Sequence, residues 1–550
     1  MRYRIILYCC VMLSLFSCRT TYYKDFNMQN MNRSAREYDS DINFQILPAT
    51  LKVLQNQYPQ AVQEKTLRLD AARGEGETAQ ILLINGGEAQ EVFFEISKLQ
   101  GPEDFSLPID FAAVGYVPVK RPSLVGFKKR ARFPDPLIPT NKARVEKHKS
   151  QSFYYTVYVP EEAPAGTYTG RLMVRLQNST SLEIPVTVQV YEVTLPKSDF
   201  LKTWFAPPGS FEPPYYDETW PSEKVKALYK QLRKYRINTG FRLNMNGVFS
   251  KDAQGNVVTN WKDFDREVEE KLSYGIRNFD VYLDVPKDFL SEKNNAMREQ
   301  KTEEYRLFYR HLLEKNWTEY FYWYCFDEPR DSQIKNITAI LDWGHEIAPK
   351  IKNLIPLGFS TKSGMRKFVS HLDTWCPHIH QYDKTFFSER QAAGDEVWIY
   401  TCVQNAYKSF PDNWKIDTNG TSHRALGTWL YKHNIDGYLY WATGYWSRNN
   451  PWEDTETFIF GNGDGSMLYP ALDKKSDPYP SIRLHITRDA IEDFDLLKML
   501  EAKYGKNTEN TEVKNILSCK SLIYDMKKFS NNDYDYINVH KRILELLSAQ

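Results

Sequence analysis

The sequence predicts a multidomain protein, with an N-terminal β-sandwich, then a (β/α)8 TIM-type barrel, and finally a C-terminal helical extension. Three observations predict it. Short β-prone runs separated by turn signals fill residues 44–198. Strand-like and helix-like segments alternate over residues 199–480, and periodic helical sequence occupies residues 481–550. A chain of 550 residues can form two or three domains, each with its own core.

Residues 1–18 have the features of a bacterial lipoprotein signal peptide. Two arginines precede an apolar run, Ile5 to Phe16, that is too short to span a bilayer as a structural helix. The ending LFSC resembles a lipoprotein box, which implies cleavage before Cys18 and acylation of its thiol. An ordinary secretory leader or a buried apolar start is the alternative. We expect a lipid-anchored protein of the cell envelope, periplasmic or on the outer surface, with residues 19–43 as a poorly ordered polar tether.

The β-sandwich region contains five runs typical of strands: TAQILLING, EVFFEISKL, SFYYTVYVP, GTYTGRLMVRL and SLEIPVTVQVYEV. A long basic insertion, residues 115–139, interrupts them. It either contacts the following domain or forms a solvated loop.

The barrel region predicts eight strands, and helical patterns lie between most of them. We place the strands at Leu201–Ala206, Ile237–Leu243, Ile276–Asp284, Tyr320–Phe326, Leu354–Phe359, Thr374–Ile379, Val397–Cys402 and Gly437–Trp441. The helical patterns are Ser222–Arg236, Trp261–Tyr274, Asn295–Lys315, Ser332–Ala348 and Thr421–His433. Residues 482–504 then form a periodic helix rich in acids and leucine, and residues 510–550 are also helical in pattern. They should pack as a cap, with Arg488 and Asp489 as a structural pair.

The segment EYFYWYCFDEPR, residues 319–330, is the strongest candidate for a site. Its aromatic, β-prone residues stop at Asp327 and Glu328, and Pro329 cannot donate to a sheet ladder, so the predicted fourth strand should end here. In a (β/α) barrel the carboxyl ends of the strands carry the active site. The alternative is a helix N-terminus, where acids before proline serve as a cap.

Composition excludes some functions. With 71 basic and 70 acidic residues the net charge is +1, so no nucleic-acid partner is expected. The four cysteines after the predicted signal peptide form neither a CxxC motif nor a Cys/His cluster, and His378 and His380 have no third ligand beside them, so we expect no metal and no cofactor. Aromatic residues make up 14% of the chain, which suits both a core and sugar-stacking surfaces.

Five segments together resemble glycoside hydrolase family 123, which contains β-N-acetylgalactosaminidases. They are the FDEP quartet and the later GYLYWATGYW, NPWED, GNGDGSMLYP and PSIRLHITRDAIEDFDLL. The order of parts, a β-sandwich before a barrel, is also similar. The resemblance implies a retaining mechanism in which the substrate's own 2-acetamido oxygen is the nucleophile, an exception to the usual pair of protein carboxylates.

The resemblance assigns roles to the two adjacent acids. Glu328 would be the general acid/base, with a pKa raised by burial among aromatic residues. Asp327 would stay ionised, accept a hydrogen bond from the acetamido N–H and stabilise the oxazolinium-like intermediate. Residues near other strand ends are candidates for substrate binding. Trp441 and Trp446 would pack against the sugar ring, and Tyr382 and Tyr400 would hydrogen-bond the acetamido carbonyl. Asn244 and Asp284 would hydrogen-bond sugar hydroxyls.

The sequence therefore predicts an exo-acting glycoside hydrolase that releases terminal β-linked N-acetylgalactosamine from glycans or glycolipids. Two alternatives stay open. The same barrel acts on another hexosamine or sugar, or the protein is a non-catalytic, cell-surface glycan-binding lipoprotein.

Overall fold

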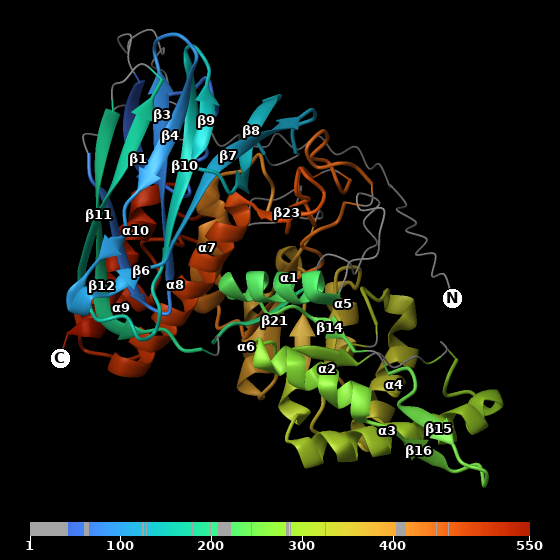
Figure 1. The fold of residues 1–550 in the computed structure, drawn as a ribbon. Helices are drawn as coiled ribbons and strands as arrows, with labels where there is room; N and C mark the ends of the chain where they lie inside the picture. Colours follow the sequence, from blue (N-terminus) through green and yellow to red (C-terminus); the bar gives the residue numbers. More distant parts are fainter. Residues whose placement is uncertain are drawn as a thin grey trace, which may run out of the picture.

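The structure is a computed structural model of the chain. It describes residues 42–59, 65–123, 126–127, 129–177, 181–197, 200–206, 222–243, 245–281, 285, 288–324, 326–402, 414–446, 448–459 and 461–549. A β-rich N-terminal domain is followed by a domain with a curled parallel sheet and helices (Figure 1). The predicted signal peptide, with Cys18, lies outside the described residues.

The N-terminal β domain consists of two sheets that share one hydrophobic core. The first has the order β1-β3-β10-β7-β8, and the second contains β2, β12, β11, β4 and β9 with the short β5 and β6 beside them. The strands are β1 (Ile42–Pro48), β2 (Leu67–Arg73), β3 (Gly76–Asn85), β4 (Gln90–Ile96), β5 (Leu99–Gln100), β6 (Ser106–Leu107), β7 (Ile109–Val119), β8 (Ala131–Ile138), β9 (Lys142–Val145), β10 (Lys149–Tyr158), β11 (Gly166–Leu176) and β12 (Ser181–Thr194).

Alternation along the strands builds this core. In β12, Ile184, Val186, Val188 and Val190 are buried while the residues between them are polar or partly exposed, the period-two pattern of a strand with one covered face. The rings of Phe94 and Phe153, one from each sheet, lie 4.7 Å apart between centroids. β3 is buried along its whole length because other parts of the chain cover its second face.

The second domain is organised around an eight-stranded parallel sheet with the order β13-β22-β21-β20-β19-β18-β17-β14. Its strands are β13 (Lys202–Phe205), β14 (Phe241–Arg242), β17 (Phe279–Val281), β18 (Phe321–Trp323), β19 (Lys352–Pro356), β20 (Thr374–Cys376), β21 (Glu396–Thr401) and β22 (Gly437–Tyr440). Strands that are adjacent in the sheet follow one another in the chain, except that the first strand, β13, pairs with the last, β22. The sheet curls so far that Phe205 of β13 forms a parallel bridge with Thr239, just before β14.

Helices connect the strands, as the alternating pattern predicts. They are α1 (Ser222–Lys234), α2 (Lys262–Ser273), α3 (Asn295–Lys315), α4 (Ile334–Ile347), α5 (Lys362–Met365), α6 (Lys384–Ala392) and α7 (Gly420–Lys432), and a small hairpin of β15 (Phe249–Lys251) and β16 (Val257–Thr259) precedes α2. Among the described residues, no helix combines the length and the apolar character needed to cross a bilayer.

After β22 come the short β23 (Leu468–Tyr469) and β24 (Tyr479–Pro480), and then three helices, α8 (Ile482–Tyr504), α9 (Thr511–Leu517) and α10 (Asp533–Ser548). Helix α8 starts at Ser481, whose hydroxyl accepts the backbone N–H of Leu484 at 3.2 Å. Figure 1 shows α7, α8 and α10 beside the N-terminal β domain, and α8 contacts both β3 and α7. Because α8 is covered on several sides, its charged residues from Arg483 to Asp495 are buried.

The buried charges of α8 are paired. Arg424 of α7 donates to Asp493 at 2.8 Å, and Arg488 donates to Asp489 at 2.6 Å, with both arginines inside the protein. The predicted structural pair of Arg488 and Asp489 is confirmed. The Arg424–Asp493 pair joins α8 to α7, and Arg488 also donates to the hydroxyl of Thr78 on β3 at 3.1 Å, so the buried charges of α8 contact both domains.

The basic insertion contacts the second domain. Arg121 forms an ion pair with Glu456, and Ser123 donates its hydroxyl to Asp417 at 2.6 Å. Asp135, on β8, is fully buried against Arg483 of α8. Of the two possibilities left by the sequence, contact with the following domain is correct for these residues.

Replacing Arg483 should destabilise the protein strongly. Its guanidinium donates to Asp135 at 2.8 and 2.9 Å and to the carbonyls of Trp414 and Gly463 at 2.7 Å, and both charged side chains are fully buried. Arg483→Met would leave the carboxylate of Asp135 buried without a cation. We expect the free energy of unfolding, measured by chemical denaturation, to fall by about 3–5 kcal/mol.

A matched control is Arg542→Met, which removes an exposed arginine that pairs with Glu512 at 2.6 Å. This variant should lose far less stability than Arg483→Met, because water screens the exposed pair. Equal losses in the two variants would contradict the assignment of Arg483 as a buried structural cation.

Candidate active site

Asp327 and Glu328 lie in the loop after β18. The strand ends at Trp323, three residues earlier than the sequence predicts, so both acids are on the loop and not on the strand. The backbone of Glu328 has φ +44°, a left-handed conformation that is uncommon outside glycine. Its N–H donates to the carbonyl of Pro356 at the end of β19, at 3.1 Å. The loop therefore aims the two neighbouring side chains by its backbone.

The carboxyl of Glu328 is half-buried and accepts a hydrogen bond. The phenol of Tyr400, near the end of β21, donates to its Oε1. The pKa of Glu328 is raised to about 7, mainly by burial and to a smaller extent by the charge of Asp327, while the hydrogen bond from Tyr400 opposes this rise. A carboxyl with such a pKa is available both as an acid and as a base near neutral pH.

Asp327 has a different environment. Its side chain is exposed, and Oδ1 accepts a hydrogen bond from the phenol of Tyr324 at 3.1 Å. The ring of Tyr324 stacks on Trp204 of β13, with 5.6 Å between centroids and 16° between planes. The two acids are therefore held by different tyrosines, one directly after β18 and one near the end of β21.

Gly358, two residues after β19, lies against the Glu328–Tyr400 pair. A Cβ atom built on Gly358 would overlap both the carboxyl oxygen of Glu328 and the hydroxyl of Tyr400. Only glycine leaves space for this hydrogen bond, so the position is part of the site's construction.

His378 supports the same pair. It is fully buried, and its Nε2 accepts the backbone N–H of Cys402 at 3.3 Å. Its ring meets Tyr400 edge-on, with 4.9 Å between centroids. The buried imidazole therefore fixes the ring of Tyr400 from one side.

The side chains around the two acids come from the carboxyl ends of strands in one sheet. Trp204 belongs to β13, Tyr324 follows β18, Gly358 follows β19, His378 follows β20 and Tyr400 is near the end of β21. Parallel strands bring their carboxyl ends to one edge, where ligands of α/β folds bind.

The alternative assignment of the acids as a helix cap does not describe this loop. The following helical turn begins at Asp331, and its cap is formed by Arg330, whose N–H donates to Gln333 at 2.9 Å. Asp327 and Glu328 precede that turn and contact tyrosines instead.

Trp441 directly follows β22 and is partly exposed, as expected of a residue at this edge. Its indole N–H donates to the buried Asp464 at 3.2 Å, and its ring packs on Phe458 and Tyr445 at 4.9 and 5.0 Å. Burial raises the pKa of Asp464 to about 6. Trp441 is thus fixed in one orientation by its own contacts.

Two predicted substrate contacts are placed in the hydrophobic core. Tyr382 is 7% exposed and packs on Phe387 and Trp429, between α6 and α7. Trp446 is 1% exposed, and its N–H donates to Ser466 and to the carbonyl of Leu468. Neither ring is open to a sugar, because both pack in the hydrophobic core. The assignment of both residues to substrate binding is withdrawn.

The remaining predicted contacts, Asn244 and Asp284, lie outside the described residues. Sequence reasoning missed Trp204, Tyr324 and Gly358, and it considered His378 only as a metal ligand. Tyr324 lies in the segment 319–330, three residues before Asp327. A run of aromatic residues does not show which ring faces the carboxylate.

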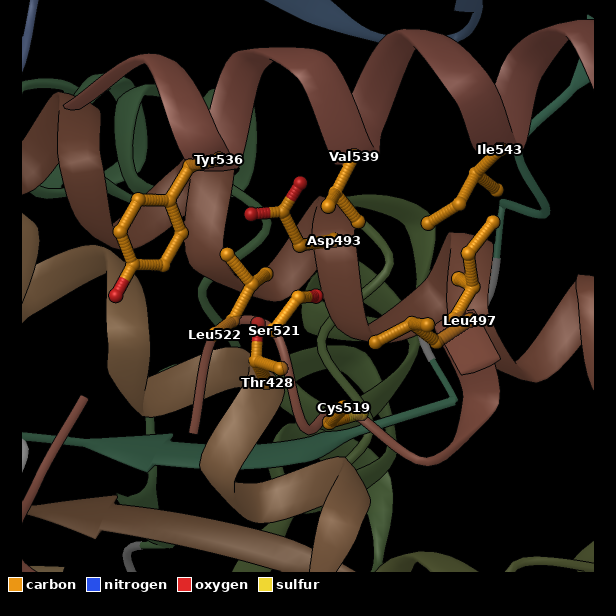
Figure 2. A pocket seen from close by; sticks show the side chains of 10 residues that line it. Thr428, Asp493, Leu497, Cys519, Ser521, Leu522, Tyr536, Val539 and Ile543 are labelled. Atoms are coloured by element: carbon orange, nitrogen blue, oxygen red, sulfur yellow. The ribbon is translucent and has the colours of Figure 1, made fainter. Parts of the chain in front are cut away.

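A small pocket elsewhere in the protein is not a sugar site. It lies where α7, α8, α9 and α10 meet, and Figure 2 shows Tyr536, Val539, Ile543 and Leu497 closing around it. Its acidic member, Asp493, is paired with Arg424. Half of the lining residues are aliphatic, as expected of imperfect packing between helices.

Comparisons with known proteins agree with this geometry. Residues 222–500 match the model of the glycoside hydrolase 123 catalytic domain, and residues 52–176 match that of the glycoside hydrolase 123 N-terminal domain. Among curated proteins, no sequence matches significantly.

Three solved structures are similar to different degrees. A family 123 glycoside hydrolase from Clostridium perfringens, described for glycolipid glycan hydrolysis, has 17% identity and a TM-score of 0.67, and the alignment covers 92% of this chain and 98% of that one. A family 39 glycoside hydrolase from Bacteroides cellulosilyticus WH2 has 11% identity, a TM-score of 0.35 and coverage of 78% and 81%. A Bacteroides ovatus GH5 xyloglucanase has 9% identity, a TM-score of 0.31 and coverage of 82% and 100%.

The first of these shares the fold of both domains, whereas the other two are too dissimilar to bear on it. The family model covers just over half of the chain, including Asp327, Glu328 and seven of the eight strands of the parallel sheet. The chain belongs to glycoside hydrolase family 123 and is a glycosidase.

Proposed function

We propose that the protein is an exo-acting β-N-acetylgalactosaminidase that cleaves terminal residues from glycans or glycolipids with retention, using the substrate's 2-acetamido group as nucleophile. One observation carries the proposal. A protonatable carboxyl, Glu328, with a pKa of about 7, stands directly beside a second carboxyl, Asp327, in a member of this family. The solved family 123 enzyme from Clostridium perfringens is described for glycolipid glycan hydrolysis, which supports the substrate class.

The two acids divide the work of such a reaction. Protonated Glu328 donates its proton to the glycosidic oxygen while the acetamido carbonyl oxygen attacks the anomeric carbon and the aglycone leaves. Asp327, on the exposed side, accepts the acetamido N–H and stabilises the positive charge of the cyclic intermediate. Glu328, now ionised, removes a proton from the water that opens this intermediate.

Tyr400 and Tyr324 hold these acids in place. Because the hydroxyl of Tyr400 already donates to Glu328, we assign it to positioning that carboxyl, and not first to the acetamido carbonyl. Tyr324 does the same for Asp327. We assign Trp441, which follows β22 at the same edge of the sheet, to packing against the sugar ring.

A complete (β/α)8 barrel and a two-sheet sandwich are the architecture we propose for this enzyme. The chain-order sequence of the eight parallel strands and the bridge between Phe205 and Thr239 support closure of the sheet. In a closed barrel the site would lie at the carboxyl rim.

Hydrolysis of chromogenic β-GalNAc, β-GlcNAc and β-Gal substrates tests the proposal. We expect β-GalNAc to be cleaved and β-Gal, which lacks the acetamido group, to be inert, and a thiazoline mimic of the intermediate should inhibit. Preference for β-GlcNAc would move the assignment to another hexosamine. Equal cleavage of β-Gal would rule out acetamido participation, and no cleavage of any substrate would favour a glycan-binding role.

The activity should decline as pH rises through about 7. The reactive form of Glu328 is protonated, and burial raises its pKa to about 7, so this form is lost above that pH. In Tyr400→Phe the hydrogen bond that lowers the pKa is absent, so the decline should move to higher pH. The pH profiles of kcat/KM for the wild type and for Tyr400→Phe measure the decline and its shift.

Tyr382→Phe is the control for this shift, because Tyr382 is a core residue and does not touch Glu328 in the described structure. Its profile should keep the wild-type midpoint. An unchanged midpoint in Tyr400→Phe would show that the Tyr400 hydrogen bond does not tune the acid.

We also propose that Cys18 carries a lipid that anchors the enzyme in the cell envelope. The apolar run ending in LFSC supports it. Incorporation of labelled fatty acid into the wild type but not into Cys18→Ser is the expected result, and labelling of both would point to another site.

A further inference from the structure

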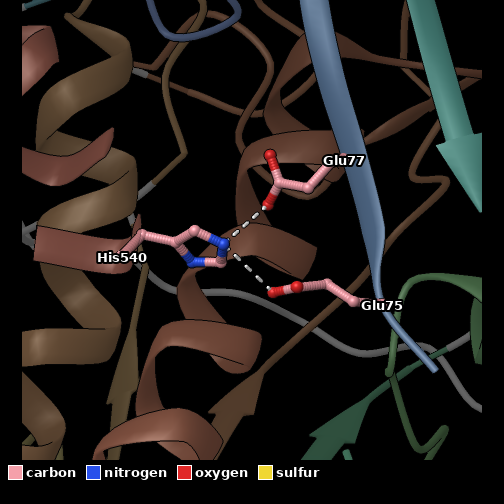
Figure 3. Close-up of side chains that lie close together, drawn as sticks. All are labelled: Glu75, Glu77 and His540. Atoms are coloured by element: carbon pink, nitrogen blue, oxygen red, sulfur yellow. Dashed lines mark ion pairs between the residues drawn. The ribbon is translucent and has the colours of Figure 1, made fainter. Parts of the chain in front are cut away.

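A buried cluster of two glutamates and one histidine joins the N-terminal β domain to the last helix. Glu75 lies in the turn between β2 and β3, Glu77 lies on β3, and His540 lies on α10. Figure 3 shows both carboxylates directed at the same ring nitrogen. Oε1 of Glu75 and Oε1 of Glu77 are each 3.6 Å from Nε2 of His540.

These distances are too long for hydrogen bonds but fit ligands of one ion. Two ligand atoms on a tetrahedral zinc ion, each about 2.1 Å from the metal, lie about 3.4 Å apart. The backbone carbonyl of Asp70, on β2, is a further oxygen, 3.3 Å from the same nitrogen. Three oxygens thus lie 3.3 to 3.6 Å from Nε2, close to the ligand–ligand distance on a tetrahedral zinc ion.

A second observation points to a ligand. The Oε1 atoms of Glu75 and Glu77 are buried and have no hydrogen-bond partner among the described residues, although Glu75 is only 2% exposed. Its other oxygen is satisfied, since it accepts the backbone N–H of Ala72 at 2.6 Å. Apart from their 3.6 Å ion-pair contacts with His540, these oxygens have no compensation, and carboxylate oxygens without a hydrogen bond at such depth are costly unless a cation lies beside them.

The surrounding charge also calls for a cation. Five buried carboxylates face two buried arginines in the region where β3, α7, α8 and α10 meet: Glu75, Glu77, Asp489, Glu492 and Asp493 against Arg424 and Arg488. Asp493 lies 3.3 Å from Nδ1 of His540. A histidine that binds a metal through Nε2 is commonly oriented by a carboxylate that accepts from Nδ1, and Asp493 is in that position.

We propose that Glu75, Glu77 and His540 form a structural site for a divalent cation, zinc by its ligand set, with the carbonyl of Asp70 as the fourth ligand. The ion would fasten α10 to the N-terminal β domain. The site is separate from Asp327 and Glu328, so the inference does not depend on the proposed reaction. The competing arrangement is a protonated His540 that serves as the cation itself.

Zinc binding by the full-length chain tests the site without any substitution. After removal of metals by a chelator and dialysis against zinc chloride, elemental analysis should find one zinc ion per chain, and zinc should raise the Tm. Cobalt(II) in its place should give the visible absorption of a tetrahedral ion. Protein that retains no zinc, gives no such absorption and keeps the same Tm would overturn the proposal and leave His540 as a protonated partner.

Two variants locate the ion. His540→Gln and Glu75→Gln should each weaken zinc binding by more than about 100-fold, whereas His433→Gln, which changes a buried histidine packed on Trp429, should bind as the wild type does. Unchanged affinity in both cluster variants would place the metal elsewhere and refute the assignment. If either variant fails to fold, the stoichiometry and cobalt spectrum of the wild type still decide.

Discussion

Glu328→Gln should lower kcat/KM for a β-GalNAc substrate by about 10²–10⁴-fold, the contribution of a general acid/base. Glutamine keeps the size of the side chain and its contact with Tyr400, but it cannot give a proton to the leaving oxygen. The loss should be smaller for substrates with a good leaving group, such as a nitrophenol, because departure of that group needs less protonation. Comparison of steady-state rates for two aglycones of different acidity measures this difference.

Glu319→Gln is the matched control. Glu319 is an exposed acid just before β18, in the same sequence segment as Glu328, and its substitution should leave kcat/KM unchanged. If Glu328→Gln retained wild-type activity on both aglycones, the acid would have to be a different residue and the proposed mechanism would fail.

The architecture was largely predictable because local sequence patterns encode it. Residues 295–315 and 482–504 form helices with the predicted boundaries, and each predicted strand of the parallel sheet overlaps a strand of the structure. Seven of the eight observed strands are shorter than predicted, as β18 shows, because only the central residues of a short, twisted strand keep ladder hydrogen bonds. Helix α6 was missed since its sequence, KTFFSERQA, has little amphipathic pattern.

The site was predictable only in part. Asp327 and Glu328 are adjacent in sequence, so a local signal marked them, and Tyr400 was found because it lies near the end of a strand. Tyr382 was ranked equally by the same reasoning, although the chain after β20 turns its ring into the core. Position at a strand end therefore places a residue near the site but does not give the direction of its side chain.

Contacts between distant segments could not be predicted. Trp204 reaches Tyr324 across the curl of the sheet, and Glu75 meets His540 across almost the whole chain. The expectation of no metal rested on the absence of closely spaced Cys and His residues, a rule that detects only ligands near one another in sequence. Such a rule cannot detect ligands that come from the first domain and the last helix, as in the proposed cation site.

Asp327→Asn should lower kcat for the β-GalNAc substrate by about 10²–10³-fold, the usual loss when one group that stabilises charge in the transition state is removed. Asparagine is the same size and can still accept the hydrogen bond from Tyr324. It lacks the negative charge that would offset the oxazolinium-like cation. A thiazoline inhibitor should lose affinity by a similar factor, because its bound form carries that charge, whereas KM for the substrate should change little.

Tyr324→Phe separates charge from position. This variant keeps the ring stacked on Trp204 but removes the donor that holds Asp327, so its loss should be smaller than that of Asp327→Asn. The rates and the inhibition constants of the two variants are compared on one substrate. An equal fall in both would make the orientation of Asp327, and not its charge, the dominant contribution. Wild-type affinity for thiazoline in Asp327→Asn would contradict a role for this carboxylate in stabilising the intermediate.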